Sequence, residues 1–147
     1  MKNNIILLFS AAIAIALMSV SCKKDDSVAK PVITFTEVGH DNSKHAMRGD
    51  DMHLEAEIVA EGLIKRIDVE IHKENGGFEI EKSFTEGKYI GVKNTEFHEH
   101  IDIPADAPLG EYHLHFTVTD QAGQTVTAEE HIEVIEFDED HHHDEEE

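Results

Sequence analysis

Short runs of alternating apolar and polar residues recur along this chain, and they constrain its fold more than any other feature. From Pro31 onward no stretch has the helical period, and turn residues separate the runs. The runs predict strands at Val32–Val38, Met52–Ala60, Ile64–Lys73, Phe78–Thr85, Phe97–Ile103, Glu111–Thr119 and Thr125–Ile135. Seven short strands at this spacing predict an all-β, immunoglobulin-like antiparallel β-sandwich, with a small barrel or a jelly roll as the alternative.

The segment before Tyr112 strengthens the sandwich prediction. Residues Ile103–Gly110 are rich in proline and glycine, and Tyr112 stands early in the strand that follows. A crossing segment followed by such a tyrosine resembles the tyrosine corner of immunoglobulin-like folds. The strands on either side of Asp120–Gly123 then form the final hairpin.

The first 21 residues have the composition of a secretory signal peptide. Lys2 supplies one positive charge, and the apolar run that follows is shorter than the roughly 20 residues of a membrane-spanning helix. Small residues then precede Cys22, the only cysteine, so an intramolecular disulfide and a cysteine-based metal site are excluded. This arrangement resembles a lipobox and predicts that Cys22 is acylated and anchors the protein to a membrane. An ordinary cleaved signal with an incidental cysteine is the alternative.

These features divide the chain into a signal peptide (1–21), a lipidated linker (22–30), a sandwich (31–136) and a tail (137–147). Residues 23–26, Lys-Lys-Asp-Asp, resemble the signal that sends Bacteroidota lipoproteins to the outer surface of the outer membrane. The acidic tail holds His141, His142 and His143, and its composition predicts disorder. It either collects metal loosely or only adds solubility. The net charge of −20 disfavours nucleic-acid binding.

Histidine is the compositional anomaly, with twelve residues in the chain. In the strand Glu111–Thr119 the apolar residues occupy the even positions, which turns His113 and His115 to the opposite face. Alternate residues of one strand lie about 6.5–7 Å apart, close enough for two imidazoles to share an ion.

Neighbouring strands add ligands to this pair. Matching the inward rows of the final hairpin places His115 opposite Glu129, and it places His113 opposite His131. Alternation also turns His72 outward, on a strand that adjoins this hairpin in an immunoglobulin-like sheet. The predicted metal group is His72, His113, His115, His131 and Glu129.

A second, looser metal group is predicted on the other sheet, where His53, His98 and His100 face outward from adjacent strands. Glu99 falls on the apolar row, which predicts that the start of its strand lies outside the core. A single solvated histidine is common on an outward strand face. The metal prediction therefore depends on the two His-x-His pairs.

Four segments of the chain together resemble a family of Bacteroidota lipoproteins described only as a domain of unknown function. They are Asp51–Ile58, Ile67–His72, His98–His115 and Val118–Gly123. The resemblance covers most of Pro31–Ile135 and implies an immunoglobulin-like fold and an envelope location. It also implies histidines at the positions of His53, His72, His98, His100, His113 and His115. It implies no settled biochemical role.

The leading functional hypothesis is a lipid-anchored envelope protein that binds a divalent transition metal, zinc first and copper or nickel next. Imidazole and carboxylate ligands suit these ions, and neutral imidazole is the ligand form, so affinity should fall as the pH drops through about 6.5. The second hypothesis is an interaction module that contacts a protein or glycan, with another envelope protein as partner. Catalysis is third, because no general base beside a pocket and no nucleophile motif is recognisable.

Overall fold

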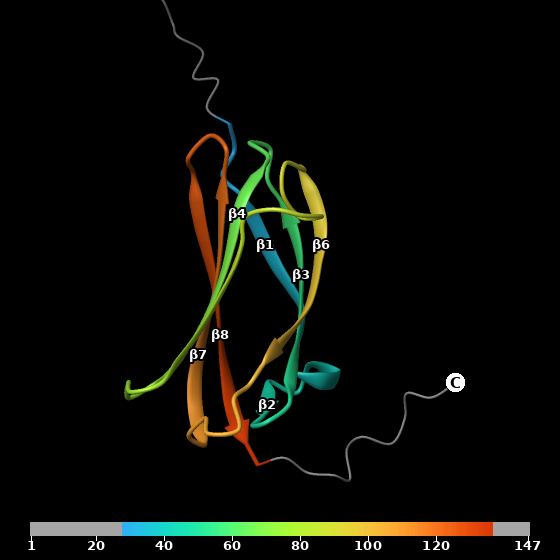
Figure 1. Ribbon diagram of the computed structural model, residues 1–147. Helices are drawn as coiled ribbons and strands as arrows, with labels where there is room; N and C mark the ends of the chain where they lie inside the picture. Colours follow the sequence, from blue (N-terminus) through green and yellow to red (C-terminus); the bar gives the residue numbers. More distant parts are fainter. Residues whose placement is uncertain (1–27, 137–147) are drawn as a thin grey trace, which may run out of the picture.

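The structure is a computed structural model, and it describes residues 28–136. In this part of the chain two β-sheets pack face to face (Figure 1). The three-stranded sheet has the order β1-β3-β6, formed by β1 (Val32–Val38), β3 (Asp51–Val59) and β6 (Asn94–Asp102). The five-stranded sheet has the order β2-β8-β7-β4-β5. Its strands are β2 (His45–Met47), β8 (Thr125–Ile135), β7 (Gly110–Asp120), β4 (Ile64–Lys73) and β5 (Glu79–Phe84).

This strand order is that of an immunoglobulin-like sandwich, so the predicted fold is confirmed and the barrel and jelly-roll alternatives are wrong. All seven predicted strands are present. The region 39–49, between the first two predicted strands, holds the 3₁₀ turn η1 (His40–Asn42) and β2, which pairs in parallel with β8. These two elements have three residues each, too few to show a period.

The core lies between the two sheets, where the inward rows of their strands meet. Phe97 of β6 and Phe116 of β7 pack edge to face, with 4.9 Å between ring centroids. Phe97 is only 1% exposed, so the expectation that its strand begins outside the core is wrong. Glu99 keeps its place on the inward row because its carboxylate accepts a hydrogen bond from the Tyr89 hydroxyl at 2.8 Å.

The tyrosine corner is also present. The Tyr112 hydroxyl donates a hydrogen bond to the carbonyl oxygen of Pro108 at 2.7 Å, and the Tyr112 side chain is buried. This bond holds the crossing segment between β6 and β7 against the start of β7. Burial also raises the pKa of Tyr112.

Several predictions fall outside the described residues. They are the signal peptide, the acylation of Cys22, most of the linker, and the tail with His141, His142 and His143. Within residues 28–136, no helix is long and apolar enough to cross a membrane.

Candidate metal centre

Three histidines meet on the outer face of the three-stranded sheet. His53 of β3 lies directly opposite His100 of β6, and His98 lies opposite Glu55 on the same pair of strands. The rings of His53 and His100 have centroids 4.1 Å apart, and those of His53 and His98 are 5.4 Å apart. The second histidine group of the sequence prediction is thus brought together, because strand alternation and antiparallel register turn all three side chains to one face.

The ligand atoms of these three histidines are close enough to share an ion. One ligand atom from each of His53, His98 and His100 lies within 4.8 Å of the others. Nitrogens bound tetrahedrally to one zinc ion at about 2.0–2.1 Å stand about 3.4 Å apart. Each pair of ligand atoms therefore has to approach by at most about 1.4 Å to close the set around an ion.

A carboxylate lies near the Nδ1 atom of each ring, and the one beside His100 is hydrogen-bonded to it. The Nδ1 atom of His100 lies 2.7 Å from Asp51 Oδ1, and that of His98 lies 3.0 Å from Glu55 Oε1. The Nδ1 atom of His53 lies 3.6 Å from Glu37 Oε1. A carboxylate that accepts the Nδ1 proton fixes the tautomer and the ring orientation, and it leaves Nε2 as a metal ligand. This carboxylate–histidine arrangement is typical of metal sites.

Exposure differs among the three ligands. The side chain of His53 is 23% exposed, whereas those of His98 and His100 are 52% and 50% exposed. The site is therefore a surface site with its inner ligand at His53. Three protein ligands on an open face leave a further coordination position for water or for another ligand.

Tyr89 supports the strand that carries His98. Its hydroxyl lies 2.7 Å from the carbonyl oxygen of His98, and it accepts a hydrogen bond from the His98 amide at 3.1 Å. The Tyr89 side chain is buried, and this burial raises its pKa. The backbone of β6 is thus held in place at a predicted ligand.

The first histidine group of the sequence prediction lies on the outer face of the five-stranded sheet, in the predicted register. His113 is opposite both His72 and His131, and His115 is opposite Glu129. The centroids of His113 and His131 are 4.6 Å apart, and Nδ1 of His115 is 3.4 Å from Glu129.

The rings of this group do not converge in the same way. His72 and His115 stack at 4.9 Å with an interplanar angle of only 22°. Nitrogen lone pairs lie in the ring plane, so two stacked imidazoles do not point at one ion between them. In the described part of the chain, sets of three ligand atoms within 4.8 Å occur only around His53.

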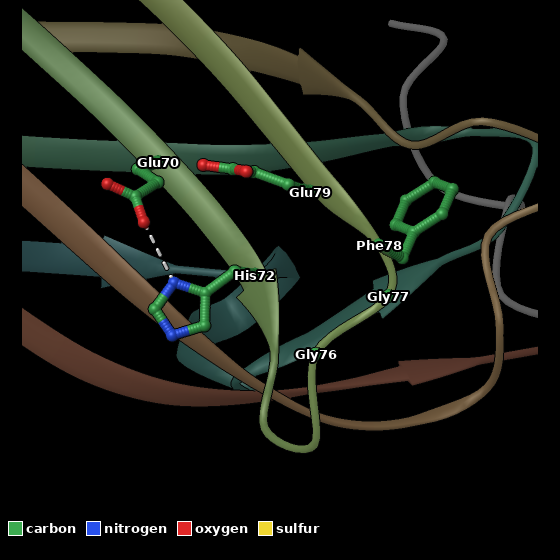
Figure 2. Close-up of a pocket in the computed structure, with 6 residues that line it drawn as sticks. All are labelled: Glu70, His72, Gly76, Gly77, Phe78 and Glu79. Carbon is green, nitrogen blue, oxygen red and sulfur yellow. Dashed lines mark hydrogen bonds and ion pairs between the residues drawn. The ribbon is translucent and has the colours of Figure 1, made fainter.

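His72 has local partners of its own, as Figure 2 shows. Its Nδ1 atom lies 2.9 Å from Glu70 Oε1 on the same strand. His72 and Glu70 line a shallow depression together with Gly76, Gly77, Phe78 and Glu79. This depression holds one imidazole and two carboxylates, so it offers an ion fewer nitrogen ligands than the face around His53.

Two candidate ligands were not predicted from the sequence. Glu37, His40 and His53 also have ligand atoms within 4.8 Å of one another. Simple alternation from Phe35 turns Glu37 inward, but the register of β1 on β3 shifts between these two residues. This irregularity places Glu37 opposite Glu55, on the outer face. His40 lies in η1, where no periodic signal exists.

Residues 20–135 match the family described as a domain of unknown function, DUF4625. The chain belongs to this family. No curated protein matches it significantly.

Similar solved structures come from longer proteins. Wild-type OgpA from Akkermansia muciniphila is 14% identical, with a TM-score of 0.51 over 71% of this chain and 29% of that one. Catalytically inactive OgpA, solved with the O-glycopeptide glycodrosocin, is 15% identical, with a TM-score of 0.52 over 78% and 32%. Spo0M, a sporulation control protein from Bacillus subtilis, is 14% identical, with a TM-score of 0.46 over 76% and 51%. The chain thus spans less than a third of OgpA, and the likeness shows the fold alone.

Proposed function

We propose that this protein binds a divalent transition metal ion through His53, His98 and His100, with zinc preferred and copper or nickel as alternatives. The observation that carries the proposal is the convergence of three imidazoles whose Nδ1 atoms each face a carboxylate. Three histidine nitrogens with carboxylates beside their Nδ1 atoms resemble the ligand set and the outer shell of known zinc sites. The ligands are all nitrogen, with carboxylates near, which suits zinc, copper and nickel.

Charge supports the same assignment. The chain has 32 acidic against 12 basic residues, and three of the acidic side chains stand directly behind the histidines. A cluster of carboxylates raises the local concentration of cations and favours their association. The site is open to solvent, so we propose capture and transfer of the ion and no catalysis, since catalysis gains from exclusion of water.

The place of action is proposed from the sequence features at the N-terminus. An acylated Cys22 would hold the domain at the outer membrane, at the cell surface of a member of the Bacteroidota. A second candidate function is an interaction module that contacts a protein or glycan, including another envelope protein. It is favoured by one observation, that a protein containing a domain of this fold was solved with an O-glycopeptide. Partner capture that survives a chelator would support this second function over the first.

The two His-x-His pairs provide a matched test. The full chain is prepared without a purification tag and with His141, His142 and His143 replaced by alanine, and zinc binding is measured by calorimetry. We expect a micromolar or tighter site. The double change His98→Ala/His100→Ala should weaken it by at least about 100-fold, because two of three ligands are lost.

The control is His113→Ala/His115→Ala, which removes the other His-x-His pair, on the outer face of the five-stranded sheet. It should leave the tight site unchanged. An absence of zinc binding, or a loss of the tight site in the control variant alone, would contradict the proposed function.

A further inference from the structure

His53 belongs to two sets of ligands. One set is His53, His98 and His100 on the sheet, and the other is Glu37, His40 and His53 beside the 3₁₀ turn. The five ligand atoms do not all lie within 4.8 Å of one another, so the two sets remain separate. In Figure 1, η1 lies beside the end of the three-stranded sheet at which β3 begins and β6 ends.

The shared histidine limits how the two sets are filled. A neutral imidazole has one nitrogen that donates and one that accepts, so it offers a single lone pair to a metal ion. Two ions at once would require an imidazolate. The two sets are therefore alternative positions for one ion, and His53 is a ligand in both.

The loop that carries His40 is held in a fixed shape. Asp41, Asn42 and Lys44 have positive φ angles of 52°, 58° and 64°, a region that is uncommon for residues with a side chain, though Asn and Asp enter it more readily than lysine. The Asn42 side-chain oxygen accepts a hydrogen bond from the Val38 amide at 3.1 Å, and the Lys44 amide donates a hydrogen bond to the Val38 carbonyl oxygen at 2.9 Å.

One bond of this loop reaches the shared ligand. The Gly39 amide donates to the carbonyl oxygen of His53 at 2.9 Å, which fixes the loop to β3 at that residue. The rings of His40 and His53 have centroids 6.1 Å apart. The side chain of His40 is 64% exposed, against 23% for His53. The second set therefore extends from a solvent-exposed ligand, His40, to the less exposed ligand that both sets share.

We propose that Glu37 and His40 form, with His53, an entry and exit position for the ion held by His53, His98 and His100. The inference rests on the proposed function. An ion that moves between the two sets keeps His53 as a ligand throughout, so it is never released in a single step. This path accelerates both uptake and release, and it leaves the equilibrium affinity of the sheet site almost unchanged. Such behaviour suits a protein that passes zinc to an acceptor.

The test compares the rate of zinc exchange with the equilibrium affinity. The full chain carries the three tail substitutions and His113→Ala/His115→Ala, and it is loaded with one equivalent of zinc. Transfer to the chromophoric chelator 4-(2-pyridylazo)resorcinol is followed by stopped flow. The variant His40→Ala, which keeps the Glu37 carboxylate beside His53, should slow transfer roughly tenfold, the scale of one lost ligand contact. Its Kd should change less than about threefold, because uptake slows equally.

The matched control is His45→Ala, which removes another exposed histidine just beyond the loop and should change neither quantity. An unchanged transfer rate in His40→Ala would overturn the inference. The inference would also be overturned if the Kd of this variant rose as much as the Kd of His98→Ala, since all five residues would then form one site. The inference would also be overturned if the parent chain bound a second zinc ion tightly and His53→Ala lost that second ion. If the parent chain bound no zinc, the proposed function itself would fail, and this outcome is distinct from the other three.

Discussion

The imidazole rings of His53 and His100 meet nearly perpendicularly across neighbouring strands, at 87° and with 4.1 Å between their centroids. The two residues are paired directly in the β3–β6 ladder, so the spacing of their side chains is set by the sheet backbone. Ligands placed on rigid strands hold their positions better than ligands placed on loops. The sheet therefore supplies the preorganised part of the site, and the loop around His40 supplies the part that meets solvent.

The carboxylate behind His100 should contribute to zinc affinity. Asp51→Asn keeps the shape of the side chain but removes the charge 2.7 Å from His100 Nδ1. We expect zinc affinity to fall about tenfold, the usual cost of a lost outer-shell partner. Calorimetry on Asp51→Asn and on Glu57→Gln checks this. Glu57 lies on the same face of β3, and its neutralisation should have little effect on zinc affinity. Equal losses of affinity in both variants would mean that Asp51 acts only through its contribution to the negative charge of this face.

Tyr89 should contribute to both stability and binding. Tyr89→Phe removes the hydroxyl that bonds the His98 backbone and the Glu99 carboxylate. We expect the free energy of unfolding to fall by about 1 kcal/mol. Zinc affinity should fall a few-fold, because β6 is held less firmly at His98. Urea denaturation and a zinc titration measure the two effects, and full affinity in a destabilised variant would show that Tyr89 acts on the fold alone.

Tyr112 should make the fold sensitive to high pH. Burial raises its pKa in the folded chain, so its contribution to stability is complete below the unfolded pKa of about 10. That contribution is lost as the pH rises through the higher folded value. Tyr112→Phe should lower stability at pH 7 by about 1 kcal/mol, since the bond to Pro108 is lost. The variant should also show a smaller further loss between pH 9 and 11 than the parent chain, by thermal unfolding at each pH.

Glu130 should contribute acid sensitivity. Its side chain lies on the inward row of β8, and the hydrogen bond from Lys44 Nζ at 3.0 Å lowers its pKa. This contribution is present above the unfolded pKa of about 4.3 and is lost as the pH falls through the lower folded value. Each side chain of the pair is 33% exposed, so the effect is at most about 1 kcal/mol. Lys44→Met should remove it, which is measured as a smaller difference in unfolding free energy between pH 7 and pH 3. An unaltered difference would contradict this assignment.

Much of the fold could be predicted from the sequence, because alternation fixes both the strands and their facing rows. Matching the inward rows of the last hairpin predicted the pairings of His115 with Glu129 and of His113 with His131, and the structure confirms both. The tyrosine corner was predicted from a single tyrosine that follows a Pro/Gly-rich segment, and the bond from Tyr112 to Pro108 confirms it.

The rest of the site depends on features that alternation does not encode. The irregularity in β1 turns Glu37 to the outer face, and the shape of the loop places His40 beside His53. Which histidine group converges depends on ring orientation, which the flanking carboxylates set. His72 turns to Glu70 on its own strand, whereas His100 turns to Asp51 on the neighbouring strand and lies against His53.

The most direct test of the central claim is a zinc titration of the full chain followed by the ¹⁵N resonances of its twelve histidine rings. The first equivalent should shift the Nε2 resonances of His53, His98 and His100 together, before any other ring responds. A first equivalent that shifts His72, His113, His115 and His131 instead, or all rings in proportion, would contradict the account.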